Sequence, residues 1–218
     1  MGEASERILI SNDWITIILL TIIGLLIYLK IKYPERFKSL QSLLYNNGYI
    51  NNYSKTTPLI FNTFSITFYF IFIFIISLFL FVVINLYDLV TYTNGKKLFL
   101  LILLSVFSFV LIRFIIGFLL SLLFEKENEQ QYFTFIKLSY LSNFSLLILP
   151  LLIINFYLGS TIFSHILTIL GTLLLLFYYF LQVKGNQKFI FSKMFYFILY
   201  LCALEISPFI IIYNLIVK

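Results

Sequence analysis

The chain has 218 residues, of which 61% are hydrophobic and only 11% charged, and its mean hydropathy is +1.03. A soluble domain of this size needs a polar surface that so few charged residues cannot form. Continuous apolar runs, such as residues 98–106, also exclude the alternating pattern of a membrane β-barrel. The net charge of +6 is explained by the basic loops of a membrane protein, and we expect no binding of nucleic acid.

Six apolar stretches of the sequence approach or exceed the roughly 20 helical residues that cross a hydrocarbon core. They lie at about residues 14–29, 59–86, 98–124, 135–158, 162–183 and 194–217. We therefore predict an all-α, polytopic transmembrane helical bundle that forms a single membrane domain over residues 1–218. The gap around Gly159 is so short that the fourth and fifth spans are expected to form a tight antiparallel hairpin. The first span is not expected to be a signal peptide, because Glu3 and Glu6 precede it instead of a basic cluster.

The positions of Lys and Arg predict the orientation of these spans. Ten basic residues fall on one side of the predicted membrane: Lys30, Lys32, Arg36, Lys38, Lys55, Lys126, Lys137, Lys184, Lys188 and Lys193. Four fall on the other side: Arg7, Lys96, Lys97 and Lys218. Basic residues accumulate in cytoplasmic loops. The prediction is therefore a multi-pass protein of the bacterial inner membrane, with both termini in the periplasm.

A cytoplasmic amphipathic helix is predicted at about residues 34–46, within the longest loop. A Pro-Glu pair at its start and an Asn-Gly pair after its end are typical of helix boundaries. Its apolar face includes Phe37, Leu40 and Leu44, whereas Arg36 and Lys38 occupy other faces. This pattern fits a helix in the membrane interface with its basic side chains near anionic headgroups. It serves either as a linker to the next span, which we favour, or as a docking surface for a partner.

Two ionisable residues, Arg113 and Glu205, lie well inside predicted spans. A charge near the bilayer centre costs about 3 kcal/mol on insertion scales, so neither is expected to face lipid. Each lies about 16 Å from the cytoplasmic end of its span, which permits an intramembrane ion pair. Pro208 frees the carbonyl of Leu204 close to this pair. We favour a pair that fixes helix register; the alternatives are a proton-carrying Glu205 and a contact with a partner subunit.

Small and polar residues follow helical spacing in several spans and predict helix-packing seams. These are Ser164, Thr168, Gly171 and Thr172 in the fifth span, Gly117 and Ser121 in the third, and Ser139, Ser142 and Asn143 in the fourth. Pro150 and Pro208 are predicted to kink their helices. Signatures of nucleotide-binding, metalloprotease and nucleophile-elbow enzymes do not occur in the sequence. We therefore expect a protein that is not an enzyme and has no cofactor or metal.

Two segments of the chain resemble segments of a known protein family. The ending FYFILYLCALEISPFIIIYNLI and the segment LIRFIIGFLLSLLF, in a layout of six spans, resemble a family of inner-membrane proteins from Bacteroidota. The motif YLCALEISP around Glu205 is the most specific part of this likeness. That family carries a domain-of-unknown-function label, so the resemblance implies a bacterial inner membrane and no particular activity.

Three classes of function are compatible with these features. The first is a non-enzymatic accessory or scaffold subunit of an inner-membrane complex, in envelope biogenesis or protein export, with other membrane subunits and the lipid bilayer as partners. The second is a small transporter, with or without proton coupling, that uses Glu205 and is built from two inverted halves of three spans each. The third is a lipid-binding or lipid-modifying protein that works from the helix at 34–46, through Arg36 and Lys38.

Overall fold

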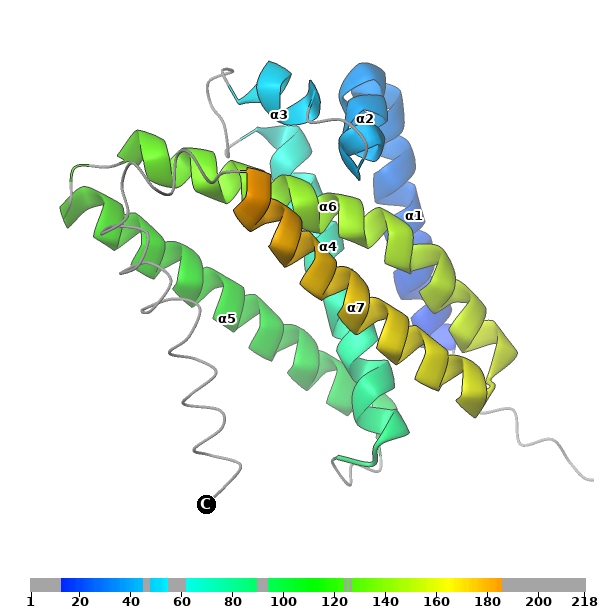
Figure 1. Cartoon of the computed structure of the whole chain (residues 1–218). Helices are drawn as coiled ribbons and strands as arrows, with labels where there is room; N and C mark the ends of the chain where they lie inside the picture. The colour runs from blue at the N-terminus through cyan, green and yellow to red at the C-terminus, as the bar shows by residue number, and fades with distance from the viewer. Residues whose placement is uncertain are drawn as a thin grey trace, which may run out of the picture.

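A computed structural model describes residues 13–44, 48–54, 62–89, 94–123, 125 and 127–185, and these residues form helices without any strand among them (Figure 1). In chain order the helices are α1 (Asp13–Lys32), α2 (Pro34–Gln41), the 3-10 helix η1 (Ser42–Leu44), α3 (Gly48–Tyr53), α4 (Thr63–Leu86), α5 (Gly95–Leu123), α6 (Glu127–Leu158) and α7 (Thr161–Gly185). The predicted all-helical bundle is confirmed for this part of the chain.

Five of the described helices, α1, α4, α5, α6 and α7, are long and apolar enough to cross a membrane. They overlap the first five predicted spans. The sixth, at 194–217, lies outside the described residues. Helix α6 contains the fourth predicted span and begins at Glu127, before the position predicted for the start of the span itself. An acidic residue in the first turn of a helix, such as Glu127, is favourable near the positive end of the helix dipole.

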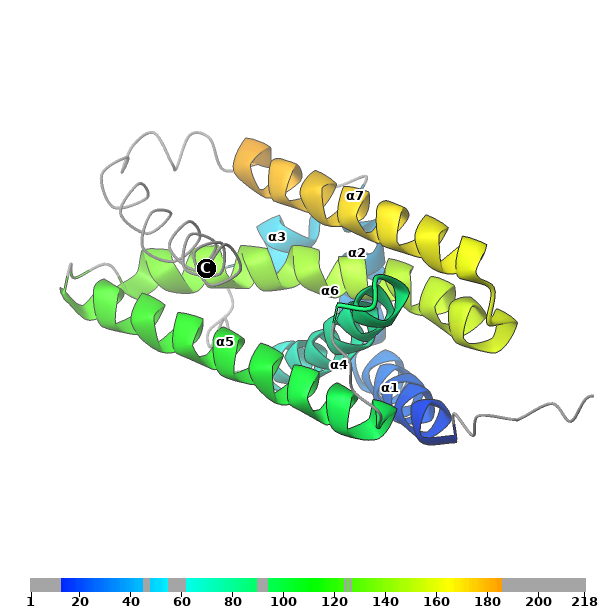
Figure 2. The ribbon, with the colours of Figure 1, turned by 90° about the horizontal axis from the view of Figure 1, so that it is seen from below.

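Helix α4 is the centre of the bundle. It contacts α1, α5, α6 and α7, and Figure 2 shows α1 and α5 on one side of it with α6 and α7 on the other. In its most apolar stretch 56% of the residues are buried, compared with 11% in α5. Its Phe and Ile side chains therefore pack against protein on several faces, whereas most of α5 presents apolar side chains to the surroundings. Such contacts between apolar helices are stabilised in a bilayer by close packing.

The connection between α6 and α7 is as short as predicted. Gly159 and Ser160 are its only residues, and the two helices run side by side in opposite directions (Figure 1). Gly159 has a φ of +61°, and its N–H donates to the carbonyl of Asn155 at 3.1 Å. Glycine adopts this left-handed conformation without the steric cost of a Cβ atom, and this hydrogen bond satisfies a carbonyl at the end of α6.

The amphipathic segment differs from its prediction in length and number of helices. The helix predicted at 34–46 is α2 followed by one 3-10 turn, η1, and a second short helix, α3, starts at Gly48 where the first was expected to have ended. Two asparagines make GYINNY a weak helix former by itself. Tertiary contacts stabilise it, since the Tyr49 ring stacks on Phe135 of α6 with centroids 5.7 Å apart. Both helices lie at the same end of the bundle (Figure 1).

Candidate functional site at the junction of α2, α3 and α4

Arg36 of α2 is a buried cation, with only 7% of its surface exposed. Its Nε donates a hydrogen bond to the hydroxyl of Tyr49 at 3.2 Å, and its Nη2 donates to the hydroxyl of Ser65 at 3.4 Å. The guanidinium carbon lies 4.6 Å from the centre of the Phe64 ring and 5.1 Å from that of Tyr53. One side chain thus connects α2 to both α3 and α4.

This position of Arg36 differs from the sequence-based interpretation, which placed it near lipid headgroups on a polar helix face. The difference arises because α3, which was not predicted, supplies Tyr49 and Tyr53 beside α2. Lys38, the other basic residue of the predicted face, is exposed. The apolar face was predicted more accurately: Leu40 is fully buried, and Phe37 packs against Phe68 with ring centroids 6.1 Å apart.

The groups that contact the guanidinium in the described part of the chain do not neutralise its positive charge. Burying a cation is costly unless polar groups or aromatic faces replace its water, and both kinds of group surround Arg36. In the described part of the chain its partners are hydroxyls and aromatic rings, which carry no formal charge. Burial raises the pKa of Tyr49, and this effect outweighs the lowering by the Arg36 charge. Tyr49 is therefore a neutral phenol that does not neutralise the charge of Arg36.

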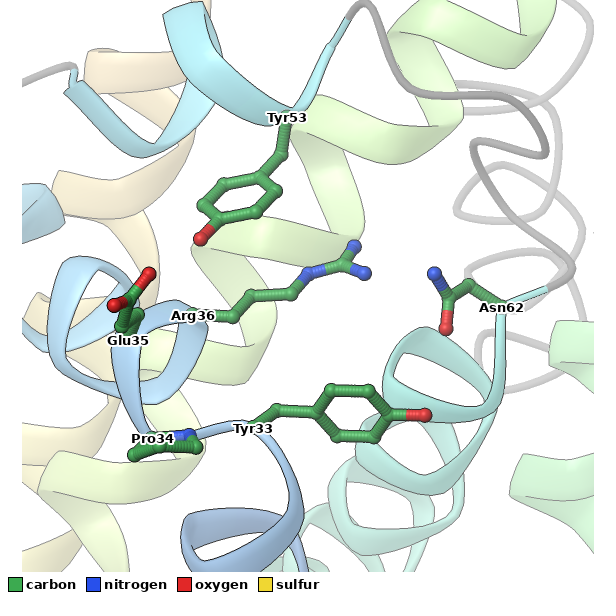
Figure 3. A pocket seen from close by; sticks show the side chains of 6 residues that line it. All are labelled: Tyr33, Pro34, Glu35, Arg36, Tyr53 and Asn62. Atoms are coloured by element: carbon green, nitrogen blue, oxygen red, sulfur yellow. The ribbon is translucent and has the colours of Figure 1, made fainter.

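An open pocket of about 380 Å³ lies beside this arginine. It is lined by Tyr33, Pro34, Glu35, Arg36, Tyr53 and Asn62. Figure 3 shows the guanidinium of Arg36 and the side-chain amide of Asn62 facing each other across it, with the Glu35 carboxylate at the other end of the arginine side chain. Asn62 caps α4, because its Oδ1 accepts a hydrogen bond from the backbone N–H of Phe64 at 3.3 Å.

A second polar contact holds the other side of α2. The Nδ2 of Asn143, on α6, donates to the carbonyls of Leu40 at 2.6 Å and Gln41 at 3.4 Å. The hydroxyl of Tyr178, on α7, donates to Oδ1 of Asn143. Asn143 is 2% exposed, so these bonds satisfy both a buried amide and carbonyls at the end of α2. Asn143 belongs to a predicted seam, but nothing in the local sequence indicates its partners.

The residues of the predicted seam on α7 separate into two groups. Gly171 and Thr168 are buried, and Ser164 donates to Oδ1 of Asn155 at 2.8 Å across the α6–α7 hairpin. Thr172 is exposed instead, and its hydroxyl bonds to carbonyls of its own helix, those of Thr168 and Ile169, both at 2.9 Å. One helical step of about 100° turns Thr172 away from the contact that Gly171 makes with α4.

The remaining predicted site residues lie elsewhere in the chain. Gly117 and Ser121 are buried on α5. Helix α6 runs through Pro150 without interruption, with this proline on its exposed surface. Leu44 lies in η1. Arg113 is half-buried in α5, where it takes part in interactions with its surroundings.

Glu205 and Pro208 lie outside the described residues, so the pairing of Arg113 with Glu205 stays a prediction. An Arg113→Glu variant alone is expected to lose about 3 kcal/mol of stability, because it places two negative charges together. Adding Glu205→Arg should restore most of this loss. Melting temperature and the monodisperse fraction in one detergent would measure both effects, with Lys97→Glu at the exposed start of α5 as a control. A double variant no more stable than Arg113→Glu would contradict the pairing.

Comparison with known proteins assigns the chain to a family. A family model described as a domain of unknown function (DUF4271) matches residues 15–216. The chain belongs to the DUF4271 family. No curated protein and no solved structure matches it. The DUF4271 match includes α2, α3 and all five long helices apart from the first two residues of α1, so the contacts of Arg36 and Asn143 lie within the family's domain.

Metal-binding side chains do not gather in the part of this DUF4271 domain that the structure describes. There, no group of three or more His, Cys, Asp or Glu residues could hold a metal ion. The chemistry that the junction offers is that of a fixed cation and an amide beside an open pocket. Such groups bind ligands or partners through charge and hydrogen bonds.

Proposed function

We propose that this DUF4271 protein is a non-enzymatic accessory or scaffold subunit of an inner-membrane complex. The observation that carries the proposal is the attachment of α2 and α3 to the bundle by buried polar groups, Arg36 on one side and Asn143 on the other. A helix that only leads the chain to its next span needs no buried cation, since apolar contact with the interface would suffice. Rigid attachment suits a surface that another subunit binds, because little ordering entropy is then lost on association.

The outer face of α2 and α3 is the part of this unit that a partner would contact. Its exposed side chains are polar and of mixed charge, namely Glu35, Lys38, Gln41, Ser42, Asn51 and Asn52. The distribution of basic residues favours the cytoplasm for this end of the bundle. The proposed partner is therefore a cytoplasmic segment of another inner-membrane protein, in a complex of envelope biogenesis or protein export in a bacterium of the Bacteroidota.

Affinity purification from native membranes tests the proposal. The tagged full-length protein, extracted in a mild detergent, should recover defined membrane proteins at a fixed ratio when analysed by quantitative mass spectrometry. A Lys38→Glu/Gln41→Glu variant should lose them, because it makes the exposed face of α2 acidic. The matched control, Lys96→Glu/Asn85→Glu, adds the same charge to exposed residues at the other end of the bundle and should retain them. Recovery of the wild-type protein alone would overturn the proposal.

A further inference from the structure

The pocket beside Arg36 presents hydrogen-bond donors from two helices. A guanidinium has five N–H donors, and the bonds to Tyr49 and Ser65 use one each, so with respect to the described residues further donors remain at the end that faces the pocket. Asn62 faces this end from α4. Because the oxygen of its amide accepts from Phe64 N–H, the NH₂ group of Asn62 is the part left to bind a ligand.

Two donor groups that face each other repel unless an acceptor lies between them. The acceptor that suits a guanidinium best is an anionic oxygen, because charge-assisted hydrogen bonds of Arg to phosphate or carboxylate are short, strong and often bidentate. An amide NH₂ supplies a further donor to the same oxygens. The pocket, at about 380 Å³, is large enough for a phosphate with a small substituent, and Tyr33 and Tyr53 provide aromatic walls beside it.

The charges around the pocket also favour an anion. The Lys32 ammonium lies 5.5 Å from the centre of the Tyr33 ring, and Lys30 is exposed on the same helix, α1. The one carboxylate in the lining, Glu35, is exposed and lies away from the space between Arg36 and Asn62 (Figure 3). Water screens an exposed charge more strongly than a buried one, so the field in the pocket is dominated by Arg36.

We propose that this pocket binds a phosphate-bearing anion between the guanidinium of Arg36 and the amide of Asn62. The pocket lies where α1 ends and α4 begins, at one end of two helices long enough to cross a membrane. The ends of membrane-spanning helices lie near the depth of lipid phosphates, and an open pocket is also accessible to a soluble phosphate compound. The pocket shares only Glu35 with the outer face of α2 and α3 to which a partner subunit is proposed to bind, and Arg36 and Asn62 do not belong to that face.

The variant that tests the site is Asn62→Asp. Aspartate caps a helix as well as asparagine does, so α4 keeps its N-terminal hydrogen bond and the protein is expected to fold. The substitution replaces the amide donor by a carboxylate, which repels an anion. The control is Lys38→Gln, which removes an exposed cation of α2 that does not line the pocket. Melting temperatures of both variants, measured without ligand, verify folding.

The experiment uses the full chain in an uncharged detergent. Native mass spectrometry first records any phosphate-bearing lipid retained by the protein, and calorimetric titration then measures binding of two probes, dihexanoyl phosphatidic acid and inorganic phosphate. We expect one saturable site, an affinity at least about tenfold weaker in Asn62→Asp, and a change within about twofold in Lys38→Gln. Binding of the lipid alone would identify a headgroup site, and binding of both probes a site for phosphate itself.

Three results would overturn the inference. The first is a wild-type protein that neither retains a phosphate-bearing lipid nor binds either probe. The second is an Asn62→Asp variant that binds as tightly as the wild type. The third is an equal loss in Asn62→Asp and Lys38→Gln, which would show that general surface charge attracts the anion without a defined pocket.

Discussion

Replacing Asn143 by leucine is expected to release α2 from the bundle and to lower the free energy of unfolding by about 3 kcal/mol. The side chain of Asn143 makes hydrogen bonds to the carbonyls of Leu40 and Gln41 and to the hydroxyl of Tyr178. Leucine has the same branched shape and number of side-chain heavy atoms but no polar atom, so the substitution removes the partner of these groups, of which the Tyr178 hydroxyl and the Leu40 carbonyl are buried. Each such group costs about 1–3 kcal/mol. Thermal unfolding in one detergent measures the loss.

Hydrogen exchange tests where the effect of Asn143→Leu acts. Amides of α2 and η1 should exchange faster, while those in the middle of α4 should keep their protection, because the packing of α4 does not depend on this amide. Tyr178→Phe removes one of the bonds and should have a smaller effect of the same kind. The matched control is Ser145→Ala on the same helix, since the one hydrogen bond of this buried hydroxyl within the described residues goes to the carbonyl of Leu141. Unchanged exchange in α2 of the leucine variant would contradict the proposed attachment.

A larger side chain at Gly171 is expected to separate α7 from α4 and α6. A Cβ atom built at this position would overlap the ring of Phe79, and it would lie 2.9 Å from Cδ1 of Ile148. Phe79 is buried, so its ring cannot move aside without disturbing other contacts of α4. Overpacking of this kind costs about 1–3 kcal/mol, so Gly171→Ala should lower the melting temperature and Gly171→Leu should lower it further.

The control for Gly171 is a glycine in a different environment. Gly24 lies in the interior of α1, and a Cβ atom there would have no neighbour within 4 Å. Gly24→Ala should therefore leave stability unchanged or raise it by up to about 1 kcal/mol, because alanine is the better helix former. Equal melting temperatures for Gly171→Ala and Gly24→Ala would show that α7 does not pack closely on Phe79.

The membrane-type fold follows from local properties of the sequence. Hydropathy is a sum over neighbouring residues, so the positions of the five long helices and the short turn at Gly159 are evident without any tertiary information. The same is true of the start of α2 at Pro34, since proline suits the first turn of a helix. Family membership is also a property of the sequence, because the DUF4271 model matches residues 15–216.

The candidate site depends on contacts that no local pattern contains. From the sequence alone, Arg36 is predicted to face lipid headgroups on an amphipathic helix. In the structure it is buried, because α3 and α4 place Tyr49, Tyr53 and Ser65 around it. Asn143 satisfies a carbonyl 103 residues away. Helical periodicity assigns a residue to a face of its own helix, whereas the neighbour of that face is set by how the helices pack. The sequence alone therefore determined the five long helices and the start of α2, whereas only the tertiary structure decided that α3 forms and which polar groups meet between the helices.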